Sequence, residues 1–133
     1  HMLGGLAAEL EGCIVVAHCA AFDVKQLLAA IQREGAGFPA FDFYCSVSTA
    51  RRAFPGRPSY SLPRLKDIFG FDYDAHNALA DAQACAALFA RCAETVDWDI
   101  SRLGIVPGRL DGDAYTACKS LRRPAPLQLG FWI

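Results

Sequence analysis

Two short segments of the chain place a histidine five residues before an aspartate. HCAAFD spans residues 18–23 and HNALAD spans residues 76–81. In each segment an apolar run gives way to a helical pattern, so we expect Asp23 and Asp81 to lie in the first turn of a helix. The positive end of a helix dipole keeps a carboxylate ionised there and directs it away from the end of the element.

Two such carboxylates brought together repel each other unless a cation lies between them. Oxygen ligands of this kind suit Mg²⁺ or Mn²⁺, which usually take few protein ligands and complete their shell with substrate phosphates. His76, with an unperturbed pKa of roughly 6.5, could accept a proton from a water molecule at neutral pH. One interpretation of the pattern is therefore a divalent-metal site with a proton acceptor beside it.

Each segment also has a purely structural interpretation. First-turn aspartates are common simply because they stabilise helices, and Asn77 is expected to cap the helix that follows it. His18, at the end of a strand, is expected to be a hydrogen-bonded structural residue rather than a proton acceptor. Either segment alone favours the structural interpretation, whereas both together in one α/β chain favour a functional pair.

The elements that must position these segments alternate between short apolar strands and amphipathic helices. Residues 13–17, CIVVA, predict a strand covered on both faces, and residues 41–47 alternate apolar and polar side chains like a second strand. This alternation predicts an α/β layered fold. Helices are expected over residues 3–12, 22–35, 48–54, 61–71 and 77–94.

Length and charge limit the classes of protein that the chain can belong to. Its 133 residues, 53% of them hydrophobic, are enough for one domain with a core, and a net charge of -1 argues against a strongly basic surface. A local cluster of Arg51, Arg52, Arg57 and Arg64 near Tyr60 could follow nucleic-acid phosphates. The alternative is a solvated loop and helix face, which such scattered arginines favour.

The six cysteines contain no CxxC pair and no zinc-ligand spacing, so metal binding through them ranks below every other hypothesis. Cys13, Cys85 and Cys92 lie in apolar runs as small hydrophobes, which indicates a reducing, cytoplasmic compartment. The sequence has no signal peptide and no apolar stretch that could cross a bilayer, so no membrane partner is expected. Residues 1–2 are expected to be a cloning scar.

VVAHCAAFDVKQLL resembles the second exonuclease motif of the DnaQ-like DEDDh exonucleases, and AHNALADAQACAALF resembles the third. The resemblance covers about residues 3–96, and it includes the strand, arginine-bearing helix and S-x-L helix that link the two motifs. It implies a ribonuclease H-like fold and 3′-to-5′ hydrolysis of nucleic acid by two metal ions, Mg²⁺ or Mn²⁺. It also implies a single-stranded 3′ end as substrate and a DNA polymerase as partner.

Carried over residue by residue, the resemblance makes Asp23 and Asp81 metal ligands and His76 the general base. Phe22 is expected to pack beneath the site rather than react. The nucleic-acid-binding residues expected around this site are His18, Cys19, Phe22, Arg51 and Arg52.

The sequence departs from the family in two respects. Cys19 stands where the family usually has asparagine, so a polar contact near the site is expected to be missing. The first motif, D-x-E, which supplies two more metal-binding carboxylates, does not precede residue 13. D-W-D at 97–99 and D-G-D at 111–113 do not replace it, because they read as cap and turn residues.

The missing motif predicts an incomplete fold that lacks the N-terminal β-meander, so that residues 3–96 are the C-terminal portion of an exonuclease domain. Residues 97–133 are an extension of unknown role. The strand at 13–17 would then have an apolar open edge, which we expect another copy, a partner chain or the segment LQLGFWI at 127–133 to cover.

Two functions follow from these expectations. In the first, the chain is a fragment or degenerate member of a two-metal-ion exonuclease and is inactive or weakly active alone. In the second, it is a non-catalytic DnaQ-like module that binds nucleic acid or a polymerase. The sequence leaves open whether the substrate is DNA or RNA, and whether the role is proofreading, repair or RNA processing.

Overall fold

The computed structural model describes residues 2–70 and 77–121. The first part of the chain alternates helices and strands as the apolar periodicity predicts, and the two strands pair in parallel. Its elements are α1 (Met2–Leu10), β1 (Ile14–Ala17), α2 (Ala20–Glu34), β2 (Phe41–Cys45), α3 (Ser46–Ala53), α4 (Leu62–Phe69) and α5 (Ala78–Glu94).

The sheet is mixed, with strand order β1-β2-β4-β5. Two of its strands belong to the extension, for which the sequence predicted only cap and turn residues at 97–99 and 111–113. The extension contains η1 (Ile100–Leu103), β3 (Ile105–Val106), β4 (Gly108–Asp111), β5 (Ala114–Thr116) and β6 (Lys119–Ser120). Strand β4 pairs antiparallel with β2, and β5 pairs antiparallel with β4. The extension therefore covers the side of β2 that faces away from β1.

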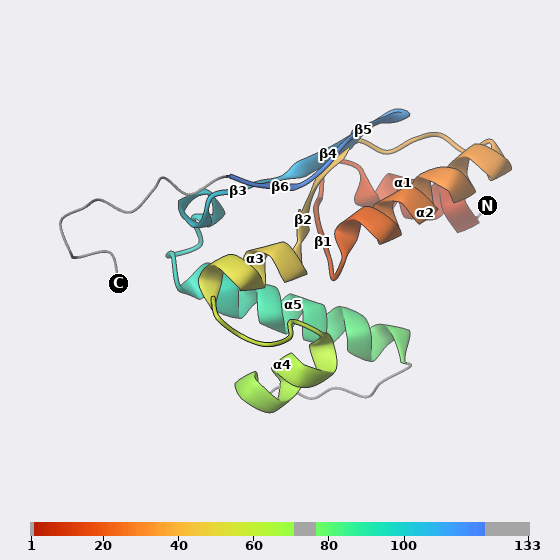
Figure 1. Cartoon of the computed structure of the whole chain (residues 1–133). Coiled ribbons are helices and arrows are strands. Elements are labelled where there is room, and N and C mark those ends of the chain that lie inside the picture. The colour runs from red at the N-terminus through yellow and green to blue at the C-terminus, as the bar shows by residue number, and fades with distance from the viewer. Residues whose placement is uncertain (1, 71–76, 122–133) are drawn as a thin grey trace.

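Helices cover both faces of the sheet, with α1 and α2 on one side and α3, α4 and α5 on the other (Figure 1). Alternation along β2 explains these layers, because successive side chains of a strand point to opposite faces. Phe41 and Phe43 are buried in a cluster with Val24 of α2. Tyr44 faces the other way, and its ring centroid lies 5.4 Å from that of Phe89 of α5.

The core on the far face depends on the helical periodicity of α5. Its apolar positions Leu88 and Cys92 are fully buried against α3 and α4, where they meet Ala50 and Leu65. Cys85 is also buried, which confirms that two of the cysteines serve as core residues, whereas Cys13 is exposed. Among the described helices, none is both long and apolar enough to span a membrane.

The structure differs from the sequence predictions at the end of β2 and in the burial of β1. The alternation predicted a strand over 41–47, but β2 ends at Cys45 and α3 begins at Ser46. Ser46 is fully buried and its Oγ lies 3.3 Å from the carbonyl oxygen of Ala17, so a tertiary contact ends the strand early. The sequence also predicted that the strand at residues 13–17 is covered on both faces. That prediction is wrong, because Ile14 is 68% exposed.

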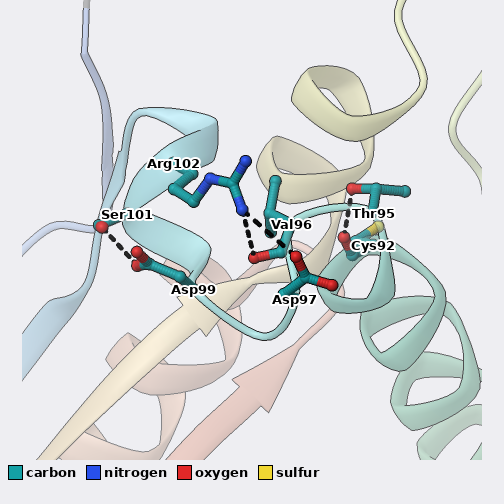
Figure 2. Close-up of polar contacts among 7 residues, drawn as sticks. All are labelled: Cys92, Thr95, Val96, Asp97, Asp99, Ser101 and Arg102. Atoms are coloured by element: carbon teal, nitrogen blue, oxygen red, sulfur yellow. Dashed lines mark hydrogen bonds and ion pairs between the residues drawn. The ribbon is translucent and has the colours of Figure 1, made fainter.

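The junction between α5 and the extension is fixed by local polar contacts (Figure 2). Arg102 Nη1 donates to the carbonyl of Val96 at 3.4 Å and lies 3.6 Å from Asp97 Oδ2. Ser101 Oγ donates to Asp99 Oδ1 at 2.5 Å, and Asp99 precedes the first residue of η1. The predicted turn is thus confirmed, and Asp99 takes the position before η1, but its side chain makes no capping hydrogen bond.

Candidate functional site

A cleft of about 1020 Å³ opens beside the carboxyl end of β1. Its walls come from β1, from the start of α2, from α3, from the loop before α4 and from the first turns of α5. Both described aspartates of the two sequence segments, Asp23 and Asp81, line this cleft, together with His18 and Cys19. The fold therefore brings together two segments that lie far apart in the sequence.

Both aspartates occupy the helix positions that the sequence predicted. Asp23 lies in the first turn of α2, and Asp81 lies in the first turn of α5. The start of α5 is fixed by Asn77, whose Oδ1 accepts a hydrogen bond from the backbone N–H of Ala80 at 3.1 Å. The predicted Asn77 cap is thus confirmed, and it fixes the first turn of α5, in which Asp81 lies.

The two carboxylates differ in their surroundings. Asp81 Oδ1 is buried and has no hydrogen-bond partner among the described residues. Asp23 is exposed, yet burial of its carboxyl raises the pKa of Asp23 above its ordinary value, and the nearby charge of His18 offsets this only in part. Desolvation is the larger of these two effects, and it opposes the helix dipole, which favours the ionised carboxylate.

Through its ring nitrogens, His18 connects the end of β1 to α3 and to the loop before α4. Its Nε2 lies 2.7 Å from the carbonyl oxygen of Tyr60, and its Nδ1 lies 2.8 Å from Ser46 Oγ. Because a carbonyl can only accept, Nε2 carries a proton, and in the neutral ring Nδ1 accepts from the Ser46 hydroxyl. Both ring nitrogens are thus engaged, as expected for a structural histidine.

The His18 network extends to α5 and favours the neutral ring. Ser46 Oγ also lies 3.4 Å from Cys85 Sγ and 3.3 Å from the carbonyl of Ala17. Burial lowers the pKa of His18, while the bond to the Tyr60 carbonyl and the charge of Asp23 act in the opposite direction. A mostly neutral His18 at neutral pH leaves the cleft without an additional positive charge at its floor.

Arginine and aromatic side chains line the same cleft as the aspartates. Arg51, Arg57 and Tyr60 all line the cleft. The guanidinium carbon of Arg51 lies 5.7 Å from the centre of the Tyr60 ring, and the Tyr60 hydroxyl donates to the carbonyl of Phe54 at 2.7 Å. From sequence these arginines favoured a solvated face. In the structure Arg51 packs on Tyr60. The guanidinium carbon of Arg57 instead lies 5.4 Å from the centre of the Phe69 ring and 6.0 Å from that of Phe54.

Not all residues predicted for the site converge on the cleft. Arg52 does not line it, because its guanidinium lies beside Gly104 of the extension. Phe22 is 67% exposed and lines a second cavity, so the prediction that it packs beneath the site is wrong. Cys19 lines both cavities. His76 lies outside the described residues.

The donors in the cleft suit a hard divalent cation. Asp81 offers a buried oxygen without a partner, and Asp23 a carboxylate whose charge burial disfavours; a cation would stabilise both. Within residues 2–70 and 77–121, no group of three or more His, Cys, Asp or Glu side chains lies close enough to hold an ion. The described cleft thus offers two carboxylates, one from α2 and one from α5, as candidate ligands.

Comparison with known proteins gives matches to nucleases. The family model described as Exonuclease matches residues 6–89. Ribonuclease T from Shewanella frigidimarina (strain NCIMB 400) is 36% identical over 86 residues, which are 62% of this chain and 39% of that protein. DNA polymerase III subunit epsilon from Aquifex aeolicus (strain VF5) is 39% identical over 51 residues, which are 38% of this chain and 25% of that protein.

No solved structure matches the chain significantly. The matched parts span well under half of the length of both relatives. The Exonuclease match covers more than half of this chain and contains both His-to-Asp segments together with the elements that bring them to one cleft. The chain belongs to the DnaQ-like 3′-to-5′ exonuclease family and has its ribonuclease H-like α/β fold.

Proposed function

We propose that this chain is part of a metal-dependent nuclease that removes nucleotides from the 3′ end of a nucleic acid. One observation carries the proposal: Asp23 and Asp81, from two different helices, line the same cleft, and Asp81 Oδ1 is buried without a partner among the described residues. A buried oxygen of this kind costs stability unless a ligand satisfies it. The family membership agrees with this chemistry.

Each residue then has a defined role. Asp23 and Asp81 hold Mg²⁺ or Mn²⁺, and His76 accepts the proton of the attacking water. The metal, when bound, activates the water and stabilises the leaving oxygen of the phosphodiester. His18 does not react; it holds the 55–60 loop against the end of β1 through the Tyr60 carbonyl. The proposed role of His76 rests on the third-motif resemblance and on its place directly before the Asn77 cap.

The substrate side of the cleft is proposed to be the wall that carries Arg51, Arg57 and Tyr60. Two guanidinium groups can follow the phosphates of a single strand, and an aromatic ring can stack on a base. One similar protein is named a DNA polymerase subunit and the other a ribonuclease, so an experiment has to decide whether the substrate is DNA or RNA. A polymerase is the protein partner that the epsilon likeness suggests.

The chain alone is proposed to be inactive or weakly active. Two carboxylates neutralise only part of the charge of two divalent ions, so a two-metal centre needs further anionic ligands. Such ligands would have to come from outside the described cleft. The open side of β1 is the place where a completing segment, a partner chain or a second copy is proposed to pair, because β1 is otherwise an apolar edge strand.

The test is digestion of 5′-labelled single-stranded DNA and RNA of equal sequence, with Mg²⁺ or Mn²⁺. Little or no shortening from the 3′ end is expected for the chain alone. Brisk Mn²⁺-dependent digestion that Asp81→Ala abolishes would support the nuclease chemistry and overturn the claim that the chain is inactive alone. Asp113→Asn is the matched control, because Asp113 lies in the β4–β5 turn, far along the chain from the cleft residues.

A second function, a non-catalytic module that binds nucleic acid, is favoured by the paired Arg51 and Tyr60 side chains in the cleft. It predicts salt-sensitive binding of an oligonucleotide without turnover and without dependence on Asp81. Under the nuclease hypothesis, Mn²⁺ strengthens oligonucleotide binding and Asp81→Asn removes that effect. Measuring affinity with Mn²⁺ and with chelator, for both proteins, separates the two functions.

A further inference from the structure

A second cavity, of about 300 Å³, lies on the face of the sheet that α2 covers. Three of the six cysteines line it: Cys19, Cys45 and Cys118. The cavity therefore joins three segments, namely the start of α2, the end of β2 and the turn between β5 and β6. The proposed nuclease chemistry uses none of these thiols.

Cys45 sits where two helices begin. It is the last residue of β2 and directly precedes α3. Its sulfur accepts hydrogen bonds from the backbone N–H groups of Val47 and Ser48 of α3 and of Ala20 of α2. The Ser48 hydroxyl is a further donor. Burial alone would raise the pKa of the Cys45 thiol, but these donors outweigh it, so the pKa of Cys45 lies below its ordinary value.

Cys118 is held against Cys45 by the extension. Its sulfur accepts hydrogen bonds from the backbone N–H groups of Cys45 and Gly108, and both thiols pack on the same buried cluster. Burial, the largest effect, and the nearby Cys45 raise the pKa of Cys118. One member of the pair is thus suited to be the thiolate nucleophile and the other to remain a thiol.

We propose that Cys45 and Cys118 form an oxidisable thiol pair, in which a peroxide modifies Cys45 and Cys118 then closes a disulfide. In the first step the Cys45 thiolate attacks one peroxide oxygen, the O–O bond breaks, and Cys45 becomes a sulfenic acid as hydroxide leaves. In the second step the Cys118 sulfur displaces the hydroxyl of that sulfenic acid. The S–S bond forms, and the Cys118 proton leaves with the hydroxyl as water.

This disulfide would have a structural consequence that is independent of the proposed nuclease activity. Cys45 ends β2, and Cys118 belongs to the extension, so the bond fastens the added strands to the exonuclease part of the sheet. It would also lie beside Ala20, the first residue of the helix that carries Asp23. The pair is therefore a modification site next to the cleft but outside it.

The test is hydrogen peroxide treatment of the reduced full chain, followed by thiol counting and peptide mapping without reductant. Loss of two of the six thiols and recovery of a Cys45–Cys118 linked peptide are expected. In Cys118→Ser, the sulfenic acid on Cys45 should persist and be trapped by dimedone. Cys13→Ser is the matched control: Cys13 is an exposed cysteine on the chain before β1, so the same cross-link should form.

Two results would overturn the proposal. The first is a map in which Cys45 stays unmodified while the exposed Cys13 or Cys19 is oxidised. The second is a linkage of Cys45 to any cysteine other than Cys118. The map of the unaltered chain decides both, so the conclusion does not depend on the folding of a variant.

Discussion

At the scale of single residues, the cleft places a carboxylate oxygen where it has no partner among the described residues. A buried acceptor left unsatisfied costs on the order of 1–3 kcal/mol, and Asp81 Oδ1 is such an acceptor. Burial likewise disfavours the charged form of Asp23. Both effects disappear when a cation is bound, so the free and metal-bound proteins should differ in stability.

Mn²⁺ is therefore expected to raise the free energy of unfolding. At a Mn²⁺ concentration one hundred times the dissociation constant, the gain should be about 2.7 kcal/mol. Asp81→Asn removes the charge at nearly constant size and should abolish most of this gain, whereas Asp113→Asn should retain it. Urea titrations with Mn²⁺ and with chelator measure the effect, and an equal gain in Asp81→Asn would contradict the assignment.

The His18 network predicts a specific pH dependence. The pKa of His18 is lowered in the folded protein, so the unfolded chain binds the proton at higher pH. The stability that the neutral ring contributes is present above about 6.5, the unfolded value, and is lost as pH falls through the folded pKa. His18→Gln should flatten this part of the stability curve. An NMR titration that places the His18 pKa at or above its ordinary value would refute the prediction.

At the scale of elements, the start of α5 determines where Asp81 lies. Asn77→Ala removes the acceptor for the Ala80 N–H and should cost about 1 kcal/mol of stability. Asn77→Asp keeps an acceptor at the same position and should cost much less. Urea unfolding compares the two variants, and equal losses would show that the cap does not hold the helix.

The extension depends on one close approach between strands. A Cβ added at Gly108 would overlap the ring of Phe43 and lie 2.7 Å from the backbone nitrogen of Cys118. Gly108→Ala is therefore expected to destabilise the protein by about 1–3 kcal/mol through overpacking. Gly37→Ala is the matched control, because a Cβ there meets nothing within 4 Å. Limited proteolysis that cuts both variants at the same rate would contradict this role.

Local patterns in the sequence predicted most elements up to residue 94, because helix periodicity and caps are local signals. They did not predict β4 and β5, since a strand of four residues with Pro and Gly beside it is specified by its partner β2 rather than by its own composition. The end of β2 was misplaced for the same reason. There the buried contact of Ser46 with Ala17 decides where the strand stops.

Only part of the candidate site could be predicted from the sequence. The first-turn positions of Asp23 and Asp81 followed from spacing, but their shared cleft was an implication of the family resemblance. The inward positions of Arg51 and Arg57 had no local signal, because they depend on how the loop before α4 folds back. A search for aromatic residues among the arginines could have found Tyr60 as the partner of Arg51.

At the scale of the whole molecule, β1 is an edge strand of the described sheet, and its first residue, Ile14, is 68% exposed. An apolar edge favours pairing with another chain. The protein is therefore expected to self-associate as its concentration rises, unless a partner is supplied. Ile14→Lys should reduce this association without affecting the fold, because lysine at an edge opposes strand pairing.

Sedimentation across a range of concentrations measures that association. Leu79→Lys is the matched control, because Leu79 is similarly exposed, at 67%, but lies on α5 rather than on the open edge. A concentration-independent monomer for the unaltered chain would overturn the prediction. An equal effect of both substitutions would show that the contact does not involve β1.

The placement of the β4–β5 hairpin has a directional consequence. It occupies the far side of β2, so β1 and β5 are the two edge strands of the described sheet, and of these two only β1 contributes residues to the cleft. Strand β1 runs straight into His18 and, one helical turn later, into Asp23. Any strand that pairs with β1 has one end next to the aspartates. The open edge that favours association is therefore also the place from which a docked strand could bring additional acidic side chains to the proposed metal site.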